Sequence, residues 1–393
     1  MDLNGLLKRA IDLGASDIHL KLGRPPILRR DGGLMPLDLP PLDEGTLAAY
    51  LERVGADSPE RLAAFHETGD LDIAYQDEGL PRFRVNVYKQ RGATSFAFRA
   101  IPKEVPTLEQ LGIPAAVRTL ADEHRGLILV TGATGSGKTT TLAAMIDHMN
   151  KTRSQHVITI EDPIEILHED QGCIVNQREI GLDTTDFGQA LRRALRQDPD
   201  IILIGELRDA ETAQTALQAA ESGHLVLSTM HTIDATETVG RMVEFFPPEK
   251  QQSIRSIMAG VMRGVISQRL LPKQGGGRVA AVEVMVMNAR IADLIREGRS
   301  DEINDAVAEG EFFGMQTFTY ALIQQVLFGS VDREVAANAA THRHDFLVAL
   351  ERAEKMQRAA QAAEAAAAAQ AAAPEAPQAP AQIETGLRIV PAG

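Results

Sequence analysis

Cysteine is nearly absent from this chain of 393 residues, since Cys173 is the only one. A single cysteine excludes an internal disulfide framework and a structural zinc site built from several cysteines. Long apolar runs are also missing, because no stretch reaches the roughly 18 apolar residues of a transmembrane helix. The first residues carry too many charges for a signal peptide. We therefore expect a cytoplasmic protein that meets a membrane only through partners.

Basic residues are also fewer than acidic residues. The chain carries 40 lysine and arginine residues against 54 aspartate and glutamate residues, which gives a formal net charge of -14. A chain this acidic has no overall attraction for a nucleic acid backbone, so only a local basic patch could serve such a role. We expect no direct nucleic acid partner.

Residues 1–102 have the pattern of a small α/β domain. Its first residues predict a helix, and RFRVNVYKQ, ATSFAFRAI and the alternating SDIHLKL predict strands. The apolar residues at helical spacing are Leu3, Leu6, Leu7 and Ala10. The stretch IPKEVPTLEQLGIP contains three prolines, which predicts an interdomain linker over residues 103–113.

A second domain is expected over residues 114–358. Loops rich in Gly, Asp or Glu follow its first three apolar runs, and helical sequence separates those runs. This alternation predicts an α/β fold with a mostly parallel sheet covered by helices, in which ligands bind at the carboxyl ends of the strands. The runs are LILVT (127–131), VITI (157–160), IILI (201–204), LVLST (225–229) and VAAVEVMVM (279–287).

The later part of the chain is expected to be helical and then to lose structure. One predicted helical face consists of Ile254, Ile257, Met258, Val261, Met262, Val265 and Ile266. Further helices are expected through about residue 358. The Ala- and Pro-rich tail, residues 359–393, allows some continued helix before Pro374. It has too few large apolar groups to fold alone, so we expect disorder there.

The strongest motif is GATGSGKT, which satisfies the phosphate-binding pattern G-x-x-x-x-G-K-[ST] between a strand and a helix. Its glycines let backbone N–H groups converge on phosphates beside a helix N-terminus. Lys138 is expected to face the β- and γ-phosphates of ATP, and the Thr139 hydroxyl to ligate Mg²⁺. The predicted nucleotide-binding residues are Gly132, Ala133, Thr134, Gly135, Ser136, Gly137, Lys138, Thr139 and Thr140.

Two acidic segments, IEDPIE and IILIGELRD, follow predicted strands. In the second, Gly205 stands just before Glu206, so another carboxylate is needed elsewhere. We expect Glu206 to anchor the metal shell, and Glu161 to orient and deprotonate the attacking water. The reverse assignment of the two roles stays open.

Two histidines, His224 and His231, bracket a predicted buried strand. His231 at its end is expected to sense the γ-phosphate through a hydrogen bond. A structural hydrogen bond and a functional role are both open for His224.

Taken in order, GATGSGKTTT, TIEDPIE, IILIGELRD and GHLVLSTMHT resemble the Walker A, Asp box, Walker B and His box of secretion ATPases. These enzymes serve type II secretion and type IV pili. SDIHLKLGRPPILRRDG resembles the N-terminal domain of the same family. Over about residues 1–350, the resemblance implies a PAS-like α/β domain, a RecA-like P-loop ATPase domain with C-terminal helices, and a homo-hexameric ring.

Within that family, the chain is most similar to the PilT-type retraction motors. Assembly and secretion members usually carry an additional N-terminal domain and a tetracysteine zinc subdomain. Neither fits a chain that has one cysteine and reaches SDIH at residue 16. RIADLIREG (290–298) partly matches the PilT signature helix AIRNLIRE, and FGMQTF (313–318) is also PilT-like.

The resemblance to retraction motors implies a biological setting. It implies pilus retraction in twitching motility, with an inner-membrane platform protein and related pilus ATPases as partners. It also implies a peripheral position at the inner face of the cytoplasmic membrane. A PilU-like paralogue, a translocase with another cargo, and a weakly active nucleotide-binding regulatory subunit stay open as alternatives.

Phosphoryl transfer needs positive charge beyond Lys138 and Mg²⁺, and the phosphate loop contains no arginine. Arg84 and Arg99 of the N-terminal domain are expected to reach a nucleotide at a subunit boundary. The competing interpretation is that either one is a solvated surface charge.

Overall fold

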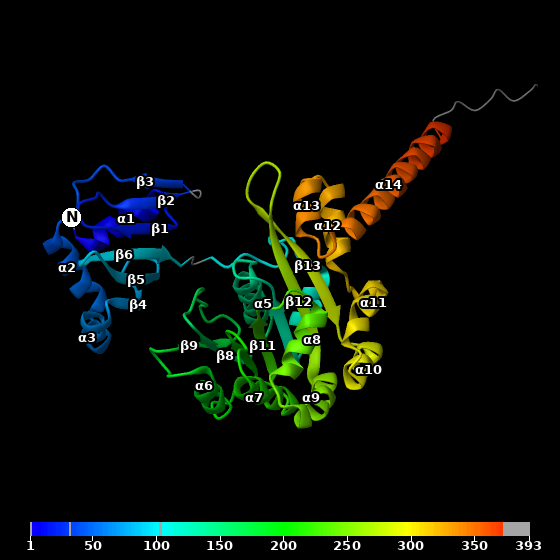
Figure 1. The fold of residues 1–393 in the computed structure, drawn as a ribbon, viewed down its shortest axis with the longest axis horizontal. Helices are drawn as coiled ribbons and strands as arrows, with labels where there is room; N and C mark the ends of the chain where they lie inside the picture. Colours follow the sequence, from blue (N-terminus) through cyan, green and yellow to red (C-terminus); the bar gives the residue numbers. More distant parts are fainter. Residues whose placement is uncertain (1, 31–32, 102–103, 372–393) are drawn as a thin grey trace, which may run out of the picture.

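The computed structural model describes residues 2–30, 33–101 and 104–371, with side chains through residue 365. Figure 1 shows two α/β parts and a long helix, α14 (Arg343–Ala371), that extends away from the second part. Pro102 and Lys103, at the predicted start of the linker, and the predicted tail from residue 372 lie outside the described residues.

The N-terminal part is a six-stranded antiparallel sheet in the order β3-β2-β1-β6-β5-β4. Phe83, Val85 and Val87 alternate into its core, while Arg84 between them stays exposed. The predicted helix and strands are confirmed. The strands are β1 (Asp17–Leu20), β2 (Ile27–Arg30), β3 (Gly33–Pro36), β4 (Asp70–Tyr75), β5 (Phe83–Gln90) and β6 (Ala93–Ala100), and the helices are α1 (Leu3–Asp12), α2 (Glu44–Gly55) and α3 (Pro59–Thr68).

The second part contains a seven-stranded sheet in the order β13-β12-β7-β11-β10-β8-β9. Its neighbouring strands run parallel except β12 and β13, so the predicted mostly parallel α/β sheet is confirmed. All residues of β7, β10 and β11 are buried, as expected for strands covered on both faces. The strands are β7 (Gly126–Thr131), β8 (His156–Glu161), β9 (Ile174–Glu179), β10 (Ile201–Ile204), β11 (Leu225–Met230), β12 (Met262–Pro272) and β13 (Arg278–Val286).

Helices cover both faces of this sheet because successive strand residues point to opposite sides. Ile128 and Val130 pack with α4 (Ala115–Ala121) and α5 (Lys138–Thr152) on one face. The opposite face is covered by α6 (Phe187–Ala194), α7 (Ala210–Glu221), α8 (Ala235–Glu244), α9 (Pro248–Val261), α10 (Ala289–Glu297) and α11 (Ile303–Ala308). A separate apolar cluster joins the last helices, α12 (Phe318–Leu327), α13 (Arg333–Ala339) and α14. Two short 3₁₀ turns, η1 (Ser300–Glu302) and η2 (Glu311–Phe313), precede these helices in the chain.

One predicted helix is partly wrong. The expected apolar face through Ile266 is helical only to Val261, where α9 ends, and β12 begins at Met262. Met262, Val265 and Ile266 keep the helical spacing of the apolar residues before them, so the sequence pattern does not show where α9 ends. Pairing decides the outcome here, because β12 bonds to β7 on one side and to β13 on the other.

Two predicted boundaries also differ from the structure. Leu108, inside the predicted linker, is buried in the cluster that contains α4 and α5. Residues 359–371, which we assigned to the tail, continue α14 to Ala371, because alanine is the strongest helix former. The predicted domain limits therefore remain predictions.

The single thiol is enclosed. Cys173 is 2% exposed, and its Sγ atom lies 3.6 Å from the carbonyl oxygen of Met149 and 3.5 Å from that of Arg153. It therefore contacts the C-terminal end of α5 and not the nucleotide loop.

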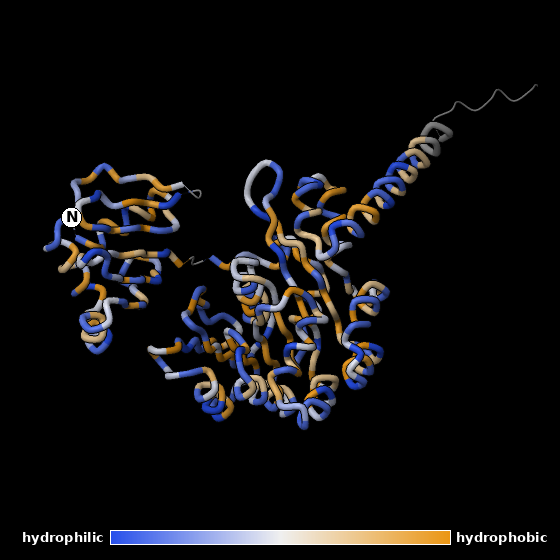
Figure 2. Tube along the Cα trace, viewed as in Figure 1, coloured by the Kyte–Doolittle hydropathy of each residue, from blue (hydrophilic) through white to orange (hydrophobic). Residues whose placement is uncertain are grey.

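Figure 2 shows hydrophobic and hydrophilic segments alternating along α14, unlike the largely hydrophobic central strands. Among the helices of the described ranges, none combines the length and the apolarity that crossing a bilayer requires.

Candidate nucleotide site

The phosphate loop connects β7 to α5 and borders a cavity of about 500 Å³. Gly132 has φ of 139°, and a Cβ atom there would lie 2.4 Å from the Gln268 carbonyl oxygen, so glycine is required. Thr134, Gly135, Gly137, Lys138, Thr139 and Thr140 line the cavity. Gly132, Ala133 and Ser136 instead line a second, smaller cavity, which Thr134 and Gly135 also border.

Lys138 is 9% exposed, and its Nζ atom donates to the carbonyl oxygens of Gly132 (2.8 Å) and Ala133 (3.1 Å). Burial lowers the pKa of this ammonium, while the charges of Glu206 and Glu165 oppose that shift. The lysine is thus an incompletely solvated cation opposite two carboxylates, which suits it to an anionic ligand.

Glu161 is the last residue of β8 and lies in the cavity wall. Its Oε1 atom accepts hydrogen bonds from Thr159 Oγ1 at 2.6 Å and from Gln177 Nε2 at 3.1 Å. Burial raises the pKa of this carboxyl group, against the lowering effect of those hydrogen bonds. A carboxylate with a raised pKa is a better proton acceptor near neutral pH.

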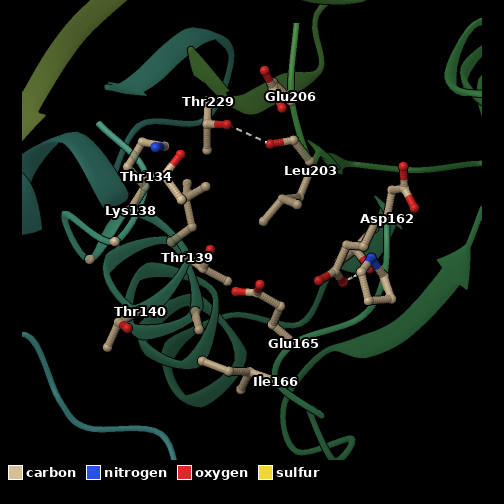
Figure 3. A pocket seen from close by; sticks show the side chains of 18 of the residues that line it. Thr134, Lys138, Thr139, Thr140, Asp162, Glu165, Ile166, Leu203, Glu206 and Thr229 are labelled. Atoms are coloured by element: carbon tan, nitrogen blue, oxygen red, sulfur yellow. Dashed lines mark hydrogen bonds between the residues drawn. The ribbon is translucent and has the colours of Figure 1, made fainter. Parts of the chain in front are cut away.

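Glu206 follows β10 and lines the same cavity as Glu161, and Figure 3 shows Glu206 beyond Leu203 of that strand. Its Oε2 atom lies 2.8 Å from Arg208 Nη2, and its Oε1 atom lies 3.3 Å from His231 Nε2. Gly205 is packed so that a Cβ atom would meet the Ile160 carbonyl oxygen at 3.2 Å. The site therefore contains both predicted carboxylates, and the imidazole of His231 contacts the carboxylate of Glu206.

The two predicted histidines differ in their surroundings. His231 lines the cavity, whereas His224 Nδ1 lies 3.0 Å from the Ala219 carbonyl oxygen and 2.9 Å from Ser222 Oγ. These contacts favour the structural alternative for His224.

The two predicted arginines are cross-strand neighbours, since Arg84 of β5 pairs with Arg99 of β6. Arg99 lines the cavity of its own chain, and its Nε atom is 2.9 Å from Asp17 Oδ1. Arg84 lines an adjoining cavity that also contains Asp162. Both arginines therefore lie near the site of their own chain, and a contribution to a neighbouring subunit stays a prediction.

Several site residues were missed from the sequence. Thr159 could have been found, because it shares a strand face with Glu161 two residues later. Gln177 gave no such signal, since it reaches Glu161 from β9, a strand that we did not predict. Glu165 lies in the recognised IEDPIE segment but received no role, and Figure 3 shows its carboxylate and Thr139 in the same part of the cavity.

A buried carboxylate behind the site fixes the helix that follows the His231 loop. Glu283 of β13 is 4% exposed, and its Oε1 atom accepts from the backbone N–H of Ala235, the first residue of α8, at 2.9 Å. Burial raises its pKa to about 7, helped by the charge of Asp234 and opposed by backbone hydrogen bonds and by Arg269.

Replacing Glu283 by glutamine should change how stability depends on pH. The folded protein holds this proton more tightly than the unfolded chain between the ordinary pKa of 4.5 and about 7. The free energy of unfolding therefore falls as pH rises through that window, by a few kcal/mol at most. Glu283→Gln lacks this loss, so its melting temperature relative to wild type should rise between pH 5 and pH 8. A constant difference across that range in thermal melts would contradict the assignment.

The fold and the site together define a P-loop ATPase: a mostly parallel sheet, a glycine loop with a buried lysine, and two carboxylates at neighbouring strand ends. The profile of the Type II/IV secretion system protein family matches residues 1–329. The chain belongs to this family of secretion ATPases.

Two curated relatives match nearly their full length. The type IV pilus retraction ATPase PilT of Pseudomonas aeruginosa is 45% identical over 346 residues, which is 88% of this chain and 100% of that protein. The type IV pilus ATPase PilU of the same organism is 38% identical over 89% of this chain and 92% of its own length. A crystal structure of the pilus retraction motor PilT with bound ADP aligns with a TM-score of 0.82 at 44% identity, covering 88% of this chain and 98% of that one.

Proposed function

We propose that this chain is the ATPase that drives type IV pilus retraction. The observation that carries the proposal is the match to PilT along the whole of that protein, at 45% identity. The match to PilU is lower, at 38%. The intact Lys138, Glu161 and Glu206 support an active enzyme over a regulatory subunit.

In the proposed reaction, water attacks the γ-phosphorus of ATP and Glu161 accepts the water proton. The new P–O bond forms as the bond between the γ-phosphorus and the β–γ bridging oxygen breaks, which releases ADP and inorganic phosphate. Lys138 stabilises the charge on the phosphate oxygens. The raised pKa of Glu161 supports its role as the base, and the hydrogen bonds from Thr159 and Gln177 orient its carboxylate.

Mg²⁺ fits the donors in this cavity. The Thr139 hydroxyl and the Glu206 carboxylate offer the hard oxygen ligands that Mg²⁺ prefers. Mg²⁺ in such sites usually keeps several waters and is held by one or two protein ligands together with phosphate oxygens. Such an ion would supply positive charge to the phosphates during transfer.

We also propose roles for the remaining site residues, which the geometry and the family support. His231, which contacts Glu206, would sense the γ-phosphate and transmit its presence to the following helix, α8. Arg99 and Arg84 would add positive charge from the N-terminal part. We further propose a homo-hexamer with sites completed between subunits. It would act at the inner face of the cytoplasmic membrane on a platform protein, together with related pilus ATPases.

Deleting the gene from its native host tests this function. Cells should keep surface pili but lose retraction, and the wild-type gene, but not Lys138→Ala, should restore it. Retraction can be followed with fluorescently labelled pili. Loss of the pili themselves would instead indicate an assembly motor. Normal pilus dynamics would indicate a motor with another cargo, and either result would overturn the proposal.

A further inference from the structure

One ion pair joins the two α/β parts next to the catalytic loop. Arg82 precedes β5 of the N-terminal sheet, and its Nη2 atom lies 2.8 Å from the Oε2 atom of Glu179, the last residue of β9. The side chains are only 15% and 4% exposed. Most of the other ion pairs in the described residues are far more accessible, so this one is unusual in being withdrawn from water.

Glu179 also holds the segment that carries the proposed base. Its Oε2 atom accepts from the backbone N–H of Ile164 at 3.3 Å, within the loop between Glu161 and Glu165. Glu179 and Glu161 are opposite each other in the register of β8 and β9, and the next N–H, of Ile180, donates to the Glu161 carbonyl oxygen at 2.8 Å. Glu179 therefore contacts the loop after Glu161 while its neighbour fixes the Glu161 backbone.

Arg82 is the charge that compensates this buried carboxylate. Glu179 lies beside a small cavity whose other charged lining residues are Arg61, Asp72, Arg84 and Asp162. Removing one partner of a buried ion pair leaves an uncompensated charge, which is strongly unfavourable unless the surroundings rearrange. Without Arg82, the Glu179 carboxylate would be drawn toward water or toward another arginine and would release Ile164.

We propose that Glu179 is a positioning residue for Glu161, and that Arg82 makes this positioning depend on contact with the N-terminal part. The inference rests on the proposed role of Glu161 as the base. It assigns Arg82 a function separate from that of Arg84 and Arg99: it acts on the loop and not on the phosphates. Turnover, more than nucleotide binding, should therefore respond to its loss.

The test compares Arg82→Ala and Glu179→Gln with Arg53→Ala in the purified full chain. Arg53 pairs with Asp77 inside the N-terminal part, so its variant also loses an arginine ion pair but leaves the loop untouched. We expect kcat to fall about 10- to 100-fold in the first two variants, since small misplacements of a catalytic group have effects of that size. The Kd of a fluorescent ADP analogue should change less than about threefold, which is small on the affinity scale.

Two further measurements separate positioning from a merely structural role. The acid limb of the pH profile of kcat, which reports the base, should shift in Arg82→Ala and Glu179→Gln but not in Arg53→Ala. The reversed pair, Arg82→Glu with Glu179→Arg, should recover part of the kcat that each single reversal loses. Wild-type kcat in Arg82→Ala, or an unshifted acid limb, would overturn the inference.

Failure of this positioning inference can be distinguished from failure of the proposed role in pilus retraction. Every readout here is made on the purified enzyme, so a chain that moves another cargo would still give these results. Normal hydrolysis by Glu161→Gln would overturn both the assignment of Glu161 as the base and this inference. That result would not contradict the proposed role in pilus retraction.

Discussion

Lys138→Ala is expected to lower kcat for ATP hydrolysis by about 10²- to 10³-fold or more, since it removes a cation from the transition state. Lys138 is buried at the loop and faces Glu206 and Glu165, so no other lysine among the cavity-lining residues can take its place. Phosphate release from purified protein at saturating ATP measures the effect.

Lys151→Ala is the matched control for that variant. Lys151 belongs to the same helix, α5, but it is 48% exposed and pairs with Asp147 four residues earlier at 2.6 Å. Lys151 does not line the nucleotide cavity, so this variant should hydrolyse ATP at the wild-type rate. Activity in Lys138→Ala equal to that of Lys151→Ala would exclude the loop as the hydrolytic site.

Glu161→Gln is expected to bind nucleotide normally and to lose about 10²- to 10⁴-fold in kcat, the usual contribution of a positioned base. Glutamine keeps the shape of the side chain and its contacts near Thr159 and Gln177 but cannot take the water proton. Single-turnover hydrolysis and titration with a fluorescent nucleotide separate the two effects. Glu169→Gln, an exposed change in the same segment, should leave both unaltered.

The division of labour between the two carboxylates can be tested with Mg²⁺. Glu206→Gln should also lose turnover, but higher Mg²⁺ concentrations should restore part of it, because the proposed loss is metal affinity. Extra Mg²⁺ should not restore Glu161→Gln. The opposite pattern would reverse the two roles.

Much of the fold follows from local sequence patterns, and the exceptions have physical causes. The strands that contain LILVT, IILI and LVLST are short apolar runs bounded by loops, so their burial on both faces could be predicted. The strand β12 could not, since its apolar residues extend those of α9 without a break. Only its pairing with β7 and β13, which are distant in sequence, determines its conformation.

The site divides in the same way. Gly132 to Thr139 form one contiguous motif, and Glu161 and Glu206 lie at or just after the ends of recognisable strands, so the sequence was enough to select them. Gln177 and Glu179 lie on an edge strand with little apolar character, and their importance comes from the register between β8 and β9. A register between strands is a tertiary property that single-sequence patterns do not contain.

The enclosed Cys173 makes the native chain almost inert toward thiol reagents. Maleimides and similar dyes need an accessible thiolate, and this sulfur is covered by α5 and its neighbours. Cysteines introduced at exposed positions such as Lys21 and Lys355 would therefore take up the label selectively, without replacement of Cys173. Doubly labelled molecules would report, by energy transfer, the separation between the N-terminal sheet and α14 while single ATP molecules are consumed.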